Sequence, residues 1–192
     1  ALLRGEAAAV TGYARIVLSR SPYPEAFAQT LAAHYVENHK LLAIGYDVPT
    51  LDAAVPTALE YHYNAPENLV QGMPAGNAMR AQVYANALRQ IVLRSLHELF
   101  SADPLRHVNA IVFNVYASDG DARVCLASAH VARADFATLN LAEGDPATHL
   151  AALGARVSAR PEALEAVTPV AGVDMTQVVT DADVAVDRRF NL

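Results

Sequence analysis

The longest helical pattern in the chain covers residues 77–102. No glycine or proline interrupts it, and its apolar side chains recur every three or four residues, as on the buried face of a helix. Pro74 and Gly76 break the chain before it, and Asp103-Pro104 ends it. The apolar positions are Val83, Tyr84, Ala87, Leu88, Ile91, Val92, Leu96, Leu99 and Phe100. They cover more than half of the circumference, so we expect a largely buried helix. A narrower polar stripe remains, formed by Gln82, Asn86, Arg89, Gln90, His97 and Glu98.

Shorter patterns precede this helix. They predict a helix over residues 2–19 and strands over residues 26–36, 40–48 and 57–63. A proline after Ser21 disfavours the helical conformation there and ends the first helix. Prolines and glycines in residues 64–76 predict a loop that leads into the long helix.

The second half of the chain contains the strongest strand pattern, residues 108–117, which is apolar almost throughout and therefore predicted to be central. A tight turn at 118–121 predicts that residues 123–130 return as its hairpin partner. Three weaker elements follow: a short helix over 134–139, a second helix from Pro146 to about Val157 capped by Asp145, and an edge strand over 167–173.

These elements predict an α+β fold. We expect a mixed, mostly antiparallel sheet of about five or six strands packed on the central helix of residues 77–102, with the N-terminal helix beside it. Residues 1–180 would form a single domain, because a chain of this length can build one stable core. Residues 181–192 have the composition of an exit linker, and the chain begins with alanine, so we expect a part of a longer protein.

The composition of the chain narrows the range of functions that it can have. The net charge of −6 disfavours a general phosphate-binding surface, because affinity for nucleic acids depends on neutralised phosphates. The single cysteine, Cys125, excludes an internal disulfide, and the chain shows neither a signal peptide nor a long apolar run. We therefore expect a cytoplasmic protein with no membrane partner.

No catalytic or metal-binding pattern stands out. The seven histidines are scattered, and His97-Glu98 begins a zincin-like motif but lacks the second histidine four residues on. Cys125 lies in an apolar strand pattern and is interpreted as a core residue. A restriction-type nuclease site would need a lysine two residues after an acidic or glutamine side chain, to act beside the Mg²⁺-binding carboxylates. The only lysine is Lys40, and Asn38 stands two residues before it. We therefore predict no metal site, catalytic residue or cofactor in this chain.

Arg133, Arg156 and Arg160 are the weak candidates for contact with nucleic acid. They follow one another closely enough to form a small basic cluster. The arginines of the long helix do not share one face and form no stripe for DNA.

Five short segments stand out when they are taken together: Ser21–Glu25 (SPYPE), Tyr46–Asp52 (YDVPTLD), Leu93–Phe100 (LRSLHELF) with Asp103, Ile111–Asn114 (IVFN) and Asp187–Leu192 (DRRFNL). They resemble the region just before the nuclease domain of bacterial Mrr-like restriction endonucleases. In order, they span nearly the whole chain. In such enzymes the next segment opens a nuclease domain of the PD-(D/E)xK fold, which binds Mg²⁺.

The resemblance implies a non-catalytic accessory domain of a DNA-cleaving defence enzyme of the restriction-modification type, with DNA as a partner through the parent enzyme. The domain would recognise DNA, regulate the nuclease or form a homo-oligomer. The alternative is a structural dimerisation or scaffold module with no DNA contact, and a third hypothesis is an independent small-molecule enzyme.

Overall fold

Five strands form the main sheet, in the order β1-β2-β5-β6-β7. The computed structural model describes residues 1–24, 27, 30–120 and 122–170. The strands are β1 (Thr30–Val36), β2 (Leu41–Val48), β5 (Ala110–Asp119), β6 (Ala122–Ala132) and β7 (Arg156–Val157). β2 and β5 run parallel, and the other neighbouring strands run antiparallel. The predicted α+β fold with a mixed, mostly antiparallel sheet is confirmed.

Strand β5 occupies the middle of the sheet because its side chains are apolar on both faces. Residues 111–115 are each at most 3% exposed, as expected for a strand covered on both sides. Phe113 contributes to the core beneath the helices. Asn114 points to the other face, where Ser128 of β6 donates a hydrogen bond to its side-chain oxygen over 2.6 Å. The predicted central strand and its hairpin partner are both present.

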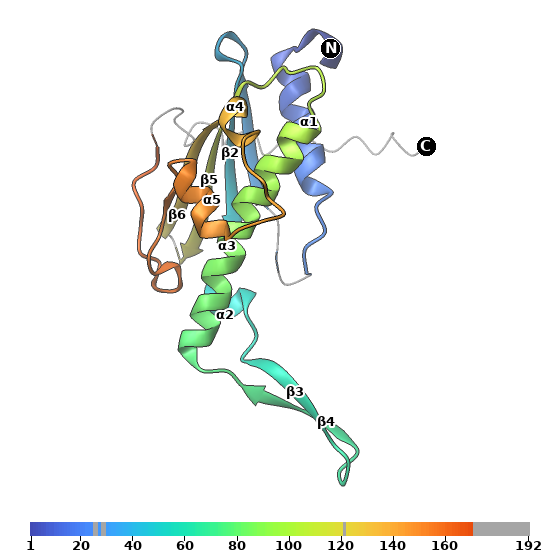
Figure 1. The fold of residues 1–192 in the computed structure, drawn as a ribbon, viewed down its shortest axis with the longest axis vertical. Helices are drawn as coiled ribbons and strands as arrows, with labels where there is room; N and C mark the ends of the chain where they lie inside the picture. Colours follow the sequence, from blue (N-terminus) through green and yellow to red (C-terminus); the bar gives the residue numbers. More distant parts are fainter. Residues whose placement is uncertain (25–26, 28–29, 121, 171–192) are drawn as a thin grey trace.

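Helices α1 (Ala7–Ser19) and α3 (Asn77–Ser101) cover one face of this sheet (Figure 1). α1 packs against β1 and α3, and the backbone N–H of Tyr35 donates to the Thr11 hydroxyl over 3.1 Å. The predicted first helix began at residue 2. It begins at Ala7 instead, because Gly5 adopts a left-handed conformation (φ 71°) and separates a short 3-10 turn, η1 (Leu2–Arg4), from the helix.

The segment between β2 and α3 differs from its prediction. The strand predicted at 57–63 is present as β3 (Ala58–Asn64), but it lies outside the main sheet. It pairs with β4 (Leu69–Pro74), which occupies the predicted loop of residues 64–76. This two-stranded hairpin projects from the body beyond the N-terminal end of α3 (Figure 1). A short helix that the sequence did not indicate, α2 (Leu51–Ala54), connects β2 to it.

The C-terminal part contains shorter elements than predicted: α4 (Arg133–Phe136), α5 (Pro146–Ala152), β7 and the 3-10 turn η3 (Pro161–Ala163). The predicted Asp145 cap is confirmed, since its carboxylate accepts from the N–H of Thr148. The helix ends before Gly154 (φ 68°), so its predicted extension to Val157 is wrong: that residue pairs with β6 instead. Residues 167–170 form no strand. Residues 171–173 of the predicted edge strand and the predicted linker at 181–192 lie outside the described residues.

Helix α3 is buried along most of its length, as predicted. Its largest fully buried side chains include Tyr84, Leu88 and Leu96. Several positions differ from the periodic pattern, among them Leu93 and Ser95, which are buried although the pattern does not include them. Val83 was expected in the core but is 41% exposed, and Arg80 is 8% exposed because its guanidinium donates to the Val55 carbonyl over 2.8 Å and contacts Asp52.

The burial of α3 predicts that substitutions at two adjacent residues have different effects on stability. Leu96→Ala should lower the free energy of unfolding by about 2–5 kcal/mol, because a fully buried leucine loses its contacts and leaves a cavity. His97→Ala should change it by less than about 0.5 kcal/mol, since His97 is exposed. Urea denaturation of both variants measures the difference. Equal destabilisation by the two substitutions would contradict this packing.

Candidate binding groove

A groove of about 650 Å³ follows the outer side of α3. Its floor includes a stripe of α3 residues: Val83, Ala87, Gln90, Arg94 and His97. These residues are alternately four and three positions apart, a spacing that keeps them on one side of a helix. The stripe is apolar toward the start of α3 and polar toward its end. The two halves of the groove therefore offer different chemistry.

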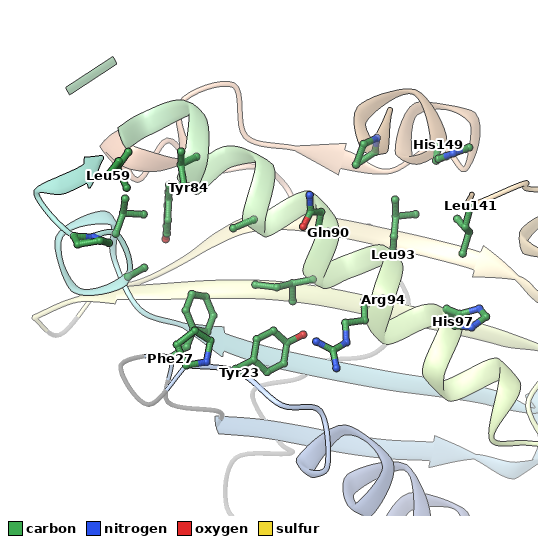
Figure 2. Close-up of a pocket in the computed structure, with 18 of the residues that line it drawn as sticks. Tyr23, Phe27, Leu59, Tyr84, Gln90, Leu93, Arg94, His97, Leu141 and His149 are labelled. Carbon is green, nitrogen blue, oxygen red and sulfur yellow. The ribbon is translucent and has the colours of Figure 1, made fainter. Parts of the chain in front are cut away.

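The two side walls come from segments far apart in the sequence (Figure 2). Tyr23 and Phe27 lie on one side of α3, and Leu141 and His149 lie on the other. The segment after α2 closes the end nearest the start of α3, where Leu59 lines the groove. The rings of Tyr23 and Phe27 are stacked, with centroids 5.7 Å apart. One wall is therefore an aromatic surface, and the other is mixed.

An ion pair on α3 holds the aromatic wall. Arg94 donates to the Glu98 carboxylate over 2.7 Å, one helical turn apart, and the same carboxylate accepts a hydrogen bond from the hydroxyl of Ser21. Arg94 also donates to the Pro22 carbonyl over 3.3 Å, and its guanidinium lies 5.0 Å from the centre of the Tyr23 ring. The hydrogen bond to Glu98 raises the pKa of Arg94, so the cation is retained at the polar end of the groove.

Tyr84 anchors the opposite end of the groove. Its hydroxyl donates to the Pro49 carbonyl over 2.8 Å, which fixes the segment that follows β2. Burial raises the pKa of Tyr84 to about 12, because the phenolate would lose its hydration. Burial also raises the pKa values of Tyr23 and of Tyr46, which lies behind the aromatic wall. These phenols therefore stay neutral at physiological pH.

The mixed wall depends on one glycine. Gly144 has a φ of 98°, and a Cβ there would lie 3.2 Å from Nε2 of His149. The absence of a side chain lets the ring approach the loop, where Nε2 lies 2.7 Å from the Glu143 carbonyl oxygen. His149 is thus held by the loop and lines the groove.

The lining offers apolar contact, aromatic stacking and hydrogen bonding. The polar groups gather at one end, in Gln90, Arg94, His97 and His149. Among the described residues, no three or more histidine, cysteine or carboxylate side chains are placed to hold a metal ion. A mostly apolar concave surface with a few polar groups at one end is typical of a binding site.

Cys125 lies away from the groove, in β6. It is 6% exposed, and burial raises the pKa of its thiol to about 11. The neutral thiol behaves as a small core side chain, since nucleophilic cysteines are exposed and have lowered pKa values. Its interpretation as a core residue is confirmed.

The three arginines selected as nucleic-acid candidates do not lie in the groove. Arg133 donates to two backbone carbonyls and pairs with Asp103 over 2.5 Å, and burial lowers its pKa. Arg156 pairs opposite Ser128 in the middle of β6, whereas Arg133 begins α4 after β6 has ended. Its guanidinium donates to the Thr168 carbonyl.

Arg160 forms an exposed ion pair with Glu165 over 2.9 Å. Each of the three arginines therefore already has acceptors within the chain. Their contact with DNA stays a prediction.

Reasoning from sequence did not select the groove residues. Arg94 was considered for a DNA-binding stripe, His97 was placed in the polar stripe of the helix and in an incomplete metal motif, and both lie in the segment Leu93–Phe100 that carries the resemblance. The alternating four- and three-residue spacing from Val83 to His97 was the available signal. It was hidden because Val83 and Ala87 also fit the buried pattern of α3.

Two of the segments that resemble Mrr-like enzymes, residues 21–25 and 93–100, meet at α3. Residues 187–192 lie outside the described residues. Ser21 and Pro22 contact Glu98 and Arg94. The Asp103 carboxylate accepts from the backbone N–H groups of residues 107 and 108 and pairs with Arg133, which fixes the connection from α3 to β5. These segments therefore form contacts that hold the scaffold together.

A scan of protein-family models finds no match to the chain, and searches of curated proteins and of solved structures find none either. None of the helices in the described part of the chain is long and apolar enough to span a membrane.

The raised pKa of Tyr84 predicts a loss of stability in alkali. Its contribution is complete below pH 10, the pKa of an unperturbed tyrosine, and is lost as the pH rises through about 12. The loss is on the order of 2 kcal/mol, because the unfolded chain ionises first. In Tyr84→Phe, the free energy of unfolding should fall less steeply between pH 10 and 12 than in the wild type. Urea denaturation at pH 8, 10 and 11 measures this slope. Parallel slopes for the two proteins would show that Tyr84 is not the buried phenol described here.

Proposed function

We propose that this chain is a non-catalytic accessory domain of an Mrr-like restriction endonuclease, a bacterial defence enzyme that cleaves DNA in the cytoplasm. The observation that supports the proposal is that two of the resembling segments meet in space. The segment at residues 21–25 reaches the segment at residues 93–100 through the Ser21–Glu98 and Pro22–Arg94 contacts. Segments that are distant in sequence thus contribute to one structural unit. This supports a shared fold for the part of the chain between these two segments.

Within such an enzyme, the work of this domain is to bind protein and thereby regulate or assemble the nuclease. The groove floor repeats every three and four residues along α3, the pattern that a helix presents to a second apolar element. Its aromatic wall and apolar half offer burial, whereas its one arginine is paired with Glu98. The Mg²⁺ of the parent enzyme would be bound by its nuclease domain, outside this chain.

Direct DNA recognition is less well supported by the charges. The chain carries a net charge of −6, and the candidate arginines Arg133 and Arg160 are paired with carboxylates. Phosphate binding would have to compete with these pairs. The alternative function, a dimerisation or scaffold module with no DNA contact, is favoured by a separate observation, the exposed apolar side chains of the β3–β4 hairpin.

The groove can be tested in the parent endonuclease. Ala87→Trp places an indole on the groove floor and should reduce plasmid cleavage at least about tenfold, because the binding surface is filled. Asn86→Trp is the matched control: it adds the same side chain to the neighbouring, exposed position outside the groove lining. Both variants should keep the wild-type melting temperature. Full cleavage by a folded Ala87→Trp enzyme would remove the groove from the proposal.

The non-catalytic role has its own test. The purified chain with Mg²⁺ or Mn²⁺ should leave supercoiled plasmid intact, and in gel shifts its binding to duplex DNA should be weak and lost between low and moderate salt. The double variant Arg156→Ala/Arg160→Ala should shift DNA as the wild type does. Nicking that a substitution within the chain abolishes would contradict the role, and salt-resistant binding that requires the two arginines would instead favour direct DNA recognition.

A further inference from the structure

The β3–β4 hairpin stands apart from the main sheet. In the described part of the chain its two strands pair only with each other, and they project from the body (Figure 1). An isolated two-stranded hairpin is marginally stable in water, because it has no second layer against which to bury side chains. The hairpin nevertheless carries five of the large exposed apolar side chains: Tyr61, Tyr63, Leu69, Val70 and Met73.

The register of the two strands sorts these side chains by face. Tyr61 is paired with Gly72, and Tyr63 is paired with Val70, so these four residues share one face. Tyr61, Tyr63 and Val70 are 60–63% exposed. The opposite face carries Glu60, His62, Asn64 and Gln71, with Leu69 and Met73 at its two ends. The ribbon thus has an apolar centre on one face and a polar centre on the other, as in a sheet with one covered face.

The hydroxyl groups of the two tyrosines already have partners within the hairpin. Tyr63 donates to the side-chain oxygen of Asn68 over 2.7 Å, and Tyr61 donates to the Ala58 carbonyl over 3.3 Å. The Tyr61 ring lies over Gly72, where a Cβ would approach it to 3.1 Å. The exposed part of this face therefore consists of the carbon atoms of the two tyrosine rings and the methyl groups of Val70. A second apolar surface can cover them without leaving a hydroxyl group unpaired.

We propose that the apolar face of the hairpin, formed by Tyr61, Tyr63, Val70 and Gly72, binds the same face of a second copy of this chain. Face-to-face packing of the two ribbons would give a four-stranded, two-layer structure with its core between the layers. It would supply the second layer that the hairpin lacks within one chain. The proposal concerns oligomerisation, one of the roles in the proposed function, but it rests on the hairpin alone.

Charge disfavours nucleic acid as the occupant. Exposed aromatic rings on a strand can stack on bases, but such platforms are flanked by basic side chains that neutralise phosphates. Residues 57–76 contain no lysine or arginine, and they include Glu60 and Glu67. A phosphate backbone would therefore meet only negative charge here.

Charge and symmetry favour a second copy. A two-fold interface places the same surface patch on both sides, so a charged face would repel itself. This face carries no charge, and Glu60 lies on the opposite face, where it stays hydrated in the dimer. Strands of six and seven residues, about 4.8 Å apart, give a face roughly 20 Å long and about 10 Å wide, or on the order of 200 Å² per copy, which is less than a standard specific interface buries. We therefore expect a weak dimer, with a dissociation constant toward the upper end of the micromolar range.

Sedimentation velocity of the chain at several concentrations between about 1 and 300 µM tests this range. The wild type should shift from monomer to dimer as the concentration rises. Tyr63→Glu should stay monomeric, because it places two carboxylates together at the two-fold interface. His62→Glu is the matched control, since it adds the same charge at the next residue on the opposite face, and it should dimerise as the wild type does. Val70→Glu and Gln71→Glu repeat the comparison on β4, in case loss of the Tyr63–Asn68 hydrogen bond alters the hairpin.

Single-cysteine variants locate the contact. With copper-phenanthroline and oxygen as the oxidant, Val70→Cys should form a disulfide-linked dimer, and Gln71→Cys, on the opposite face, should not. The wild-type chain is the blank, because Cys125 is buried. The proposal is overturned by a wild type that is monomeric at all concentrations, by dimers that persist in Tyr63→Glu and Val70→Glu, or by equal crosslinking of both cysteine variants. A monomer that binds single-stranded DNA through Tyr61 and Tyr63 would identify a stacking surface instead. None of these results would alter whether the groove variants affect the nuclease.

Discussion

The structure depends on side chains of α3 that donate hydrogen bonds to backbone carbonyls outside any sheet or helix. Three segments containing prolines lie beside this helix, and each presents a carbonyl toward it. Arg80 donates to Val55, Tyr84 to Pro49 and Arg94 to Pro22. The bond to Val55 is buried, the bond to Pro49 is partly buried and the bond to Pro22 is exposed. A buried carbonyl without a partner costs free energy comparable to a lost hydrogen bond, so the first of these bonds matters most. α3 therefore packs on the sheet through one side and positions two ends of the groove through these three donors.

This arrangement explains which parts of the fold were visible in the sequence. The long helix and the central strand were predictable, because each is decided by many apolar residues in a continuous pattern. The position of β3 outside the main sheet was not. Its alternation is that of any half-exposed strand, and only pairing with β4 determines its place. β4 itself was hidden by Gly72 and Pro74, which favour a loop when they are read locally.

The groove was less predictable than the fold, for a related reason. Arg80 and Arg94 are polar residues in a helix, and sequence alone gives no means of telling a solvated arginine from one that binds a distant carbonyl. The partners, at positions 55 and 22, lie in segments without regular structure. The aromatic wall also depends on a tertiary contact, the position of Arg94 against the Tyr23 ring. The sequence shows which side chains can donate hydrogen bonds, but it does not show which distant carbonyl each of them binds.

The groove and the hairpin are connected by one irregularity in β3. The register of the β3–β4 pair shifts between Ala58 and Glu60, so Leu59 has no partner in the ribbon, and its side chain lines the groove instead. A bulge of this kind bends a strand and re-aims one side chain. Leu59 therefore belongs to the groove, while Tyr61, two residues further on, belongs to the apolar face of the hairpin. The same irregularity therefore sets both the register of the hairpin and the assignment of Leu59 to the groove, so a substitution at this bulge would affect both surfaces.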